Sequence, residues 1–307
     1  MTRHFLRDDD LSAVEQGEVL ALARELKASR HVAQPFAGPQ AVALIFDKPT
    51  LRSQASFTAG VAELGGYPML VDGGLAQIGT RESVPDTARV LGRMTSAIVW
   101  RTFGQDRLES MAEHAGVPVV NALTDQFHPC QLLADLQTIE EHKGALAGLR
   151  VTFLGDAASN MSHSFLLAGA TAGMHVRVSG PTAFAPAEDV LARARDIAGT
   201  TGGSAAFVPD PVEAVDGADV VVTDTWVSMG KEDEAEERSV PFLPYALTSE
   251  LLAHADDAAI VLHCLPAYRG HEIAADVIDG PRSVVWDEAE NRLHAQKALL
   301  TWLVDHP

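Results

Sequence analysis

Hydroxyl and guanidinium groups follow the first apolar run of the sequence. The run AVALIFD at residues 41–47 leads into KPTLRSQ, where Thr50, Arg52 and Ser53 stand at the start of a helical pattern. The amides at the start of a helix, together with a guanidinium, form a site for an anion such as phosphate. The segment is equally compatible with a Thr or Ser helix cap beside a surface arginine, so it does not decide between the two.

Two later segments add hydrogen-bond donors. Arg101 lies near the end of the apolar run AIVWRT, and the segment FHPCQLLAD at 127–135 contains His128 and Gln131. Donors of this kind stabilise negative charge that develops on a carbonyl oxygen. A lone histidine is more often a structural polar residue than a catalytic one, and the same holds for Cys130.

The second half of the chain carries groups suited to an amino acid. Asp224 ends an apolar run and can bind an amine, while Asn160 and Ser228 offer an amide and a hydroxyl. The acidic run at 232–237 is most simply a solvated surface. The segment GDAASN at 155–160 lacks the GxGxxG pattern, which disfavours a dinucleotide cofactor.

A further turn is predicted at HCLPAYRG, residues 263–270. The Leu-Pro step at Leu265 favours a cis peptide bond there. His263 and Cys264 are two possible zinc ligands, but no third ligand stands at a matching spacing. We therefore expect no metal site.

These residues lie where strands of an open parallel sheet would end, which is where such sheets bind ligands. Strands are predicted at 41–47, 67–72, 97–102, 117–123, 151–156, 175–180, 218–226, 258–266 and 283–289, and helices at 11–27, 53–64, 109–116, 162–173 and 293–304. This pattern predicts an α/β protein with two doubly wound parallel-sheet domains. The expected domains are 1–140 and 141–290, with a C-terminal helix at 291–307 packing back on the first.

Composition narrows the functional class. The 307 residues exceed one typical domain, and the net charge of −19 disfavours binding to nucleic acid or to an anionic membrane surface. No run approaches ~18 apolar residues, and the N-terminus MTRHFLRDDD has no apolar signal core. Two distant cysteines suit a reducing compartment. We expect a cytoplasmic protein that binds small molecules.

Four motifs, DKPTLRS, FHPCQLLAD, DTWVSMG and HCLPAYRG, resemble in this order those of the carbamoyltransferases, and the SMG step is typical of the ornithine carbamoyltransferases. The resemblance covers nearly the whole chain. It implies transfer of the carbamoyl group of carbamoyl phosphate to the δ-amine of L-ornithine, giving citrulline for arginine biosynthesis, with no cofactor and no metal. The neutral amine would attack the carbonyl carbon, with no covalent enzyme intermediate.

The resemblance also implies site residues. Those matching the carbamoyl phosphate site are Thr50, Leu51, Arg52, Ser53, Gln77, Arg101, His128, Gln131, Cys264, Leu265 and Arg292, with Arg101, His128 and Cys264 taken as catalytic. Those matching the ornithine site are Asn160, Asp224, Ser228 and Met229. Gln77 and Arg81 resemble a loop lent to a neighbouring subunit, which implies a homotrimer or a multiple of trimers.

The sequence departs from the family pattern at the phosphate loop. Leu51 and Gln54 replace a Thr and an Arg of the usual Ser-Thr-Arg-Thr-Arg, which removes one positive charge, and Ser159 replaces an Asn. Two alternatives stay open: a carbamoyltransferase for another amine such as putrescine, and a non-catalytic relative that binds anions or amino acids. Asp224 argues against aspartate as the substrate.

Overall fold

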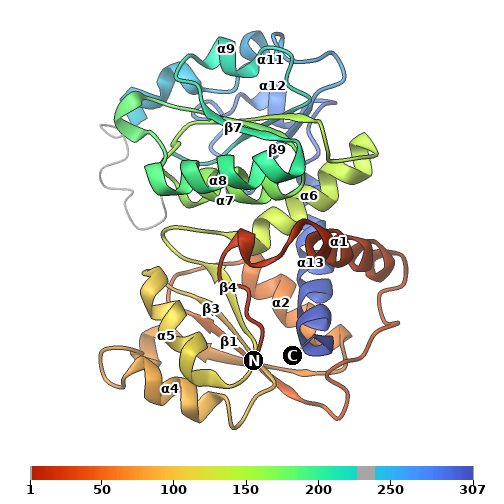
Figure 1. The fold of residues 1–307 in the computed structure, drawn as a ribbon, viewed down its shortest axis with the longest axis vertical. Coiled ribbons are helices and arrows are strands. Elements are labelled where there is room, and N and C mark those ends of the chain that lie inside the picture. The colour runs from red at the N-terminus through yellow and green to blue at the C-terminus, as the bar shows by residue number, and fades with distance from the viewer. Residues whose placement is uncertain (1, 227–238, 307) are drawn as a thin grey trace. The chain divides into compact units, whose positions relative to one another are not determined.

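The computed structural model describes residues 2–226 and 239–306, and the chain divides into two compact units. The first comprises Met1–Gln137 and Glu290–Pro307, and the second comprises Thr138–Ala289. The two boundaries fall inside helices α6 (Pro129–Lys143) and α13 (Val285–Asp305), both labelled in Figure 1.

The first unit contains a parallel four-stranded sheet in the order β2-β1-β3-β4. Its strands are β1 (Ala41–Phe46), β2 (Tyr67–Asp72), β3 (Ala97–Arg101) and β4 (Val119–Leu123), and its other helices are η1 (Asp8–Asp10), α1 (Ala13–Ala28), α2 (Arg52–Glu63), α3 (Gly73–Ala76), α4 (Val84–Leu91) and α5 (Gln105–Ala115). The central strand β1 pairs with β2 and β3, so its carboxyl end lies between theirs. The anion-binding motif follows this central strand.

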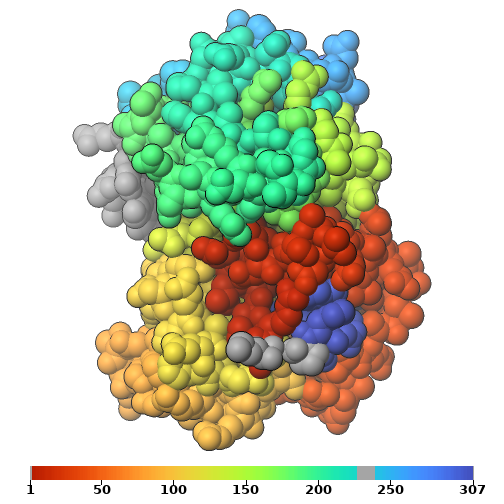
Figure 2. Space-filling model, in the orientation of Figure 1, coloured from red at the N-terminus to blue at the C-terminus, as the bar shows by residue number. Residues whose placement is uncertain are grey.

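Both faces of this sheet are covered because successive residues of a strand point to opposite sides. Val42 and Leu44 of β1 pack with α1, α2 and the end of α13, whereas Ala43 and Ile45 pack with α4 and α5. In Figure 2 the N-terminal segment (red) borders the end of α13 (dark blue) on the surface of this unit. The last helix therefore completes the core of the first unit.

The second unit contains a parallel five-stranded sheet in the order β7-β6-β5-β8-β9. Its strands are β5 (Arg150–Leu154), β6 (His175–Ser179), β7 (Ser204–Phe207), β8 (Val220–Thr223) and β9 (Ile260–His263), and its helices include α7 (Asn160–Thr171), η2 (Thr182–Phe184), α8 (Glu188–Thr201), α9 (Pro211–Val215), η4 (Val240–Tyr245), α11 (Ser249–Leu252) and α12 (Ala275–Ile278). Leu154, Val221 and Val261 of adjacent strands share one core with α9, α11 and α12.

The predicted fold class is confirmed, but the strands differ at two places, and helices such as α4, α6 and α8 were not predicted. The strand predicted at 283–289 is wrong: after one bridge between Ser283 and Val261, the chain enters α13. Asp287 and Glu288 in the first turn favour a helix start, and the apolar pair before them resembled a strand. The strand β7 was missed because its sequence, SAAF, has little β-propensity.

Within the residues described, no helix combines the length and the apolar character needed to cross a membrane.

Candidate active site

The start of α2 forms the first part of the candidate site. Leu51 precedes the helix in a helical backbone conformation and supplies no side-chain acceptor to the first amides. Arg52 begins the helix, and the buried Ser53 hydroxyl accepts a hydrogen bond from Arg292 Nη2 at 2.7 Å. An anion site needs several hydrogen-bond donors close together. This site combines the first amides of α2 with the half-buried Arg52 and the buried Arg292.

The carboxyl ends of β3 and β4 supply the second part. Arg101 is the last residue of β3 and is buried. After β4, the chain turns at Thr124, whose amide donates to Phe127 O at 2.9 Å, and this turn leads directly to the buried His128 at the entrance to α6. Gln131, one turn further on, donates from Nε2 to Asp135 Oδ1 at 2.8 Å. The Pro129 step starts the helix immediately after the histidine.

His128 is a neutral imidazole in this setting. Burial holds the pKa of His128 well below its ordinary value of 6.5, and the positive charges of Arg292, Arg101 and Arg52 lower it further. These three charges act on one ring, so the structure brings together four of the predicted carbamoyl phosphate residues. A neutral histidine among three guanidiniums donates a hydrogen bond without adding to the charge that an anion must balance.

The other residues predicted to bind carbamoyl phosphate from the first unit lie just before α2 or on the loop between α3 and α4. Thr50 is half-buried before α2, whereas Leu51 and Gln54 are exposed. Gln77 and Arg81 are exposed on the loop between α3 and α4, where the amides of Thr80 and Arg81 donate to Gln77 O.

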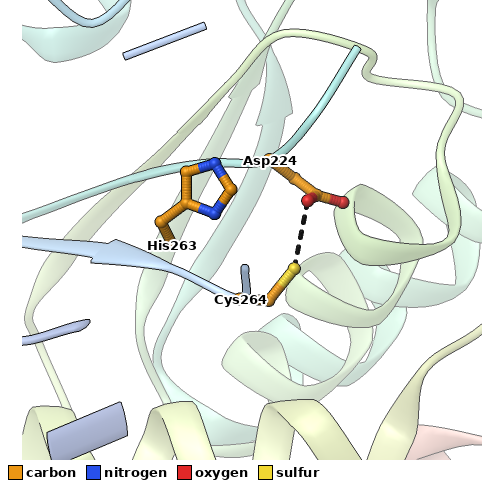
Figure 3. Close-up of side chains that lie close together, drawn as sticks. All are labelled: Asp224, His263 and Cys264. Atoms are coloured by element: carbon orange, nitrogen blue, oxygen red, sulfur yellow. Dashed lines mark hydrogen bonds between the residues drawn. The ribbon is translucent and has the colours of Figure 1, made fainter. Parts of the chain in front are cut away.

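In the second unit, the ends of the paired strands β8 and β9 bring Asp224 and Cys264 together (Figure 3). The Cys264 thiol donates to Asp224 Oδ1 at 3.1 Å, and the Thr225 amide donates to the same oxygen at 2.7 Å. Burial raises the pKa of Asp224 above its ordinary value, although His263 and these two hydrogen bonds act in the opposite direction. A partly desolvated carboxylate of this kind gains from a cationic or amine ligand.

Buried acids hold the HCLP turn in place. The His263 ring interacts through Nε2 with Glu272 Oε1 at 3.1 Å and accepts at Nδ1 from the Leu265 amide at 2.9 Å, while the His263 amide donates to Glu288 Oε2 at 2.8 Å. The predicted cis peptide bond between Leu265 and Pro266 is confirmed, and Leu265 has φ +57°. Sequence reasoning missed Glu272 and Glu288, because only the turn itself brings them beneath the histidine.

The structure supplies the third potential metal ligand that the sequence did not reveal. One ligand atom from each of Asp224, His263 and Cys264 lies within 4.8 Å of the others (Figure 3). Both ring nitrogens of His263 are already engaged, one by Leu265 and one by Glu272. In this structure, His263 and Cys264 therefore form hydrogen bonds at the turn and with Asp224.

The start of α7 carries the remaining amide group. Ser159 caps this helix by accepting from the Ser162 amide at 3.2 Å, and Asn160 follows as the first, half-buried helical residue after β5. Trp226, after β8, packs so closely on Gly155 that a Cβ there would lie 3.1 Å from its ring. Ser228 and Met229, also predicted to bind ornithine, lie outside the described residues.

Comparison with known proteins identifies the family. The model "Aspartate/ornithine carbamoyltransferase, carbamoyl-P binding domain" matches residues 3–141, and "Aspartate/ornithine carbamoyltransferase, Asp/Orn binding domain" matches residues 147–303. The chain belongs to the aspartate/ornithine carbamoyltransferase family. The resemblance inferred from its four motifs is thereby confirmed. Arg52, Arg101 and His128 fall in the region matched by the carbamoyl-P binding model, whereas Arg292 and Asp224 fall in that matched by the Asp/Orn binding model.

Proteins named ornithine carbamoyltransferase are similar to this chain over almost its full length. The ornithine carbamoyltransferase of Clavibacter sepedonicus is 62% identical over 304 residues, which cover 99% of each chain. The structure of ornithine carbamoyltransferase from Pyrococcus furiosus matches with a TM-score of 0.93 at 42% identity, covering 97% of this chain and 96% of that one. That of anabolic ornithine carbamoyltransferase from Campylobacter jejuni matches with a TM-score of 0.94 at 34% identity, covering 99% and 100%.

Proposed function

We propose that the chain transfers the carbamoyl group of carbamoyl phosphate to the δ-amine of L-ornithine, giving L-citrulline and phosphate. The observation that carries this proposal is the set of three arginines acting on one neutral histidine. Arg52, Arg101 and His128 lie in the region matched by the carbamoyl-P binding model, and Arg292 joins them from the C-terminal part of the first unit. Similarity to proteins named ornithine carbamoyltransferase over 99% of the chain supports ornithine as the acceptor.

The first unit binds carbamoyl phosphate in this proposal. Arg52 and the first amides of α2 bind the phosphate, together with Thr50, the Leu51 backbone and Ser53. Arg101 and His128 donate to the carbonyl oxygen as it gains negative charge, and Gln131 and Arg292 hold the carbamoyl group and phosphate. A donor of this type contributes roughly 3 to 4 kcal/mol to the stability of an oxyanion. The expected carbamoyl phosphate domain is 1–140, close to the matched residues 3–141.

The second unit binds ornithine, within the expected domain 141–290. Asp224 orients the amine, Asn160, Ser228 and Met229 hold the amino-acid end, and Cys264 and Leu265 lie beside the reacting group. Ornithine must react as the neutral amine, because an alkyl ammonium with a pKa of about 10.4 has no lone pair to attack with. The δ-nitrogen forms a bond to the carbonyl carbon, and the bond from that carbon to the phosphate oxygen breaks. The proton lost by the amine passes to the leaving phosphate or to water.

The proposal includes assembly into trimers in the cytoplasm. The edge strand β2 and the turns near it expose apolar side chains, with 59% of Tyr67, 50% of Leu70, 80% of Leu75 and 77% of Leu51 accessible. An unpaired apolar edge is a typical contact surface between subunits. The exposed Gln77 and Arg81 lie next to this surface in sequence and complete the site of the neighbouring subunit. Cys130 and Cys264 are thiols that form no disulfide bond with each other, as suits a reducing compartment.

Citrulline formation tests the proposal directly. We expect product from carbamoyl phosphate and ornithine, and little from putrescine, which has no α-carboxylate to bind, or from aspartate. Activity with putrescine equal to that with ornithine would indicate a different acceptor. Binding of a carbamoyl phosphate analogue with no product from any amine would indicate a non-catalytic relative. The similarity to the anabolic Campylobacter jejuni enzyme supports a role in arginine biosynthesis, which growth of an ornithine carbamoyltransferase-deficient host without arginine would test.

A further inference from the structure

We propose that Arg107, paired with Asp47, positions the loop of residues 77–82 so that this loop can complete the active site of a neighbouring subunit. The inference rests on the proposed trimeric carbamoyltransferase. It assigns a role to Arg107, which no motif of the site includes, and to Asp47, the first residue of DKPTLRS. Arg107 would act through the loop rather than on a substrate.

Arg107 of α5 holds the backbone of the loop. Its Nη2 atom donates to Ile78 O at 2.6 Å and lies 3.6 Å from Asp47 Oδ2, while its guanidinium carbon lies 5.1 Å from the centre of the Trp100 ring. A planar guanidinium that contacts an aromatic ring and two oxygens has little freedom to rotate. The loop carbonyl is therefore held from a rigid helix of the same unit.

Asp47 ties this arginine to the strand ends that carry the carbamoyl phosphate residues. Its Oδ2 atom accepts from Trp100 Nε1 at 3.1 Å and from Thr102 Oγ1 at 2.7 Å, and its amide donates to Arg101 O at 2.9 Å. Gly73, at the start of the connection to the loop, fits directly against it, since a Cβ there would lie 2.1 Å from Asp47 Oδ1. One carboxylate thus links β1, β3, α5 and the approach to the loop.

Hydrogen bonds within the loop fix its local turn, with the Gly79 amide donating to Glu82 O at 2.7 Å, and Arg107 ties this turn to α5. Gln77 has a left-handed backbone at φ +49°, which is uncommon for a residue with a side chain, and Gly79 has φ +81°. Only Ile78 is buried, at 4% exposure, and it packs with Trp100 and Val84. Gln77, Thr80 and Arg81 are exposed around it. The buried Ile78 side chain and the Ile78 carbonyl thus tie the loop to the rest of the unit, while its polar side chains are exposed.

The charge arrangement agrees with this role. Arg107 interacts with the carboxylate of Asp47, so its positive charge is balanced within the subunit. Arg81 is the remaining exposed cation of the loop, and it is free to point toward an anion on another subunit while Arg107 stays beneath. Loss of Arg107 would then loosen the loop without removing a group that contacts carbamoyl phosphate.

The variant Arg107→Met tests the positioning role, since it keeps an apolar side chain of similar length. We expect the KM for carbamoyl phosphate to rise at least roughly tenfold, the effect of losing a charged hydrogen bond, while the KM for ornithine stays within about threefold. Arg195→Met is the matched control: Arg195 Nε also donates to a backbone carbonyl, Ala205 O at 3.3 Å, but in the second unit. Unchanged carbamoyl phosphate kinetics in Arg107→Met would overturn the proposal.

Mixed subunits separate loop positioning from a local structural defect. In the proposed trimer, each site takes Arg52 from one subunit and the loop of residues 77–82 from its neighbour. When Arg52→Ala and Arg107→Met subunits are mixed, a site is intact if the Arg107→Met subunit supplies Arg52 and the Arg52→Ala subunit supplies the loop. Random mixing produces such a site in about one quarter of cases. We expect activity well above either variant alone. No recovery in mixtures that sediment as trimers would place the Arg107 defect within its own subunit and contradict the proposal. A wild-type chain that is inactive, or fully active as a monomer, would instead refute the proposed function or its trimer.

Discussion

The charged residues at the two strand-end clusters differ in how burial affects them. Around His128, burial and three arginines favour the neutral base, whereas at Asp224 burial, with a smaller contribution from the charge of Glu272, opposes the charged acid. In each cluster, one group therefore has a pKa shifted toward its neutral form. Such groups in a ligand site are typical of binding or catalysis, and they make separate predictions for activity and for stability.

Asp224→Asn should separate ornithine turnover from folding. We expect kcat/KM for ornithine to fall at least roughly 10- to 100-fold, because a charged partner of the amine is lost, with the KM for carbamoyl phosphate within a few fold. Because the pKa of Asp224 is raised in the folded chain, the folded chain binds the proton of this carboxyl group more tightly than the unfolded chain does. The protonated group therefore adds stability at low pH, and this contribution is lost as the pH rises through the folded-state pKa. The free energy of unfolding at neutral pH should thus stay equal or increase, as denaturant titration can measure.

Asp216→Asn provides the control for this change, because Asp216 is an exposed acid of the same unit. It should affect neither quantity. Retention of full ornithine turnover by Asp224→Asn would exclude Asp224 from ornithine binding, whatever its effect on stability.

His128 should make stability depend on pH in a defined direction. Its folded-state pKa lies well below the value near 6.5 expected when unfolded, so between these values the unfolded chain binds the extra proton. The contribution of His128 to the free energy of unfolding is fully present above about pH 6.5. It decreases as the pH falls below this value, by at most about 1.4 kcal/mol per pH unit. Urea titrations from pH 5 to pH 7.5 at fixed protein concentration should show a shallower loss for His128→Gln. Parallel curves for the two proteins would mean that His128 takes up its proton in the folded state.

At the level of elements, α13 is fixed to α2 by a buried ion pair. Lys297 is fully buried and donates from Nζ to Glu63 Oε2 at 2.8 Å and to Arg30 O, while Glu63 also pairs with Arg30. The acid has a second cationic partner, Arg30, on the segment that follows α1, but the lysine has no second acid among these contacts. This asymmetry predicts different costs for removing each partner.

Glu63→Ala should therefore destabilise the protein more than Lys297→Met. Without Glu63, a buried ammonium remains, at a cost of about 3 to 5 kcal/mol, whereas the methionine fills the space of the lysine and Glu63 keeps Arg30. Thermal unfolding of both variants at equal concentration measures the difference. An equal loss in the two would show that packing of the lysine stem, including its contact with Gly60, dominates over its charge.

For the whole molecule, the proposed trimer predicts an effect of substitutions at the exposed edge strand β2. Leu70→Asp should weaken self-association and lower activity in parallel, because it puts a charge on an apolar contact surface and removes the loop of the neighbouring subunit from each site. Sedimentation over a concentration series measures the association, and citrulline formation is followed on the same samples. Val212→Asp, at an exposed apolar position in the second unit, is the matched control. Leu70→Asp that stays fully active while dissociated would exclude a shared site.

The local sequence determined most of the elements and the residues at their ends. Apolar runs of strand length and helical repeats between them predicted eight strands at their observed places, and the motifs after them predicted Arg52, Arg101, His128 and Asp224 as site residues. This works because strand and helix periods, and the binding of ligands at strand ends, depend on neighbours in sequence. The family followed from the same motifs.

Tertiary structure decided what no local pattern contains. The buried acids Glu272 and Glu288 lie 9 and 25 residues from His263, and Arg107 lies 29 residues from the carbonyl that it holds. The run at 283–289 read locally as a strand but became a helix after a single bridge. Hydrogen bonds between distant segments are specified only when the sheet order brings them together, so side-chain periodicity predicts where an element begins but not which buried partner its end will meet.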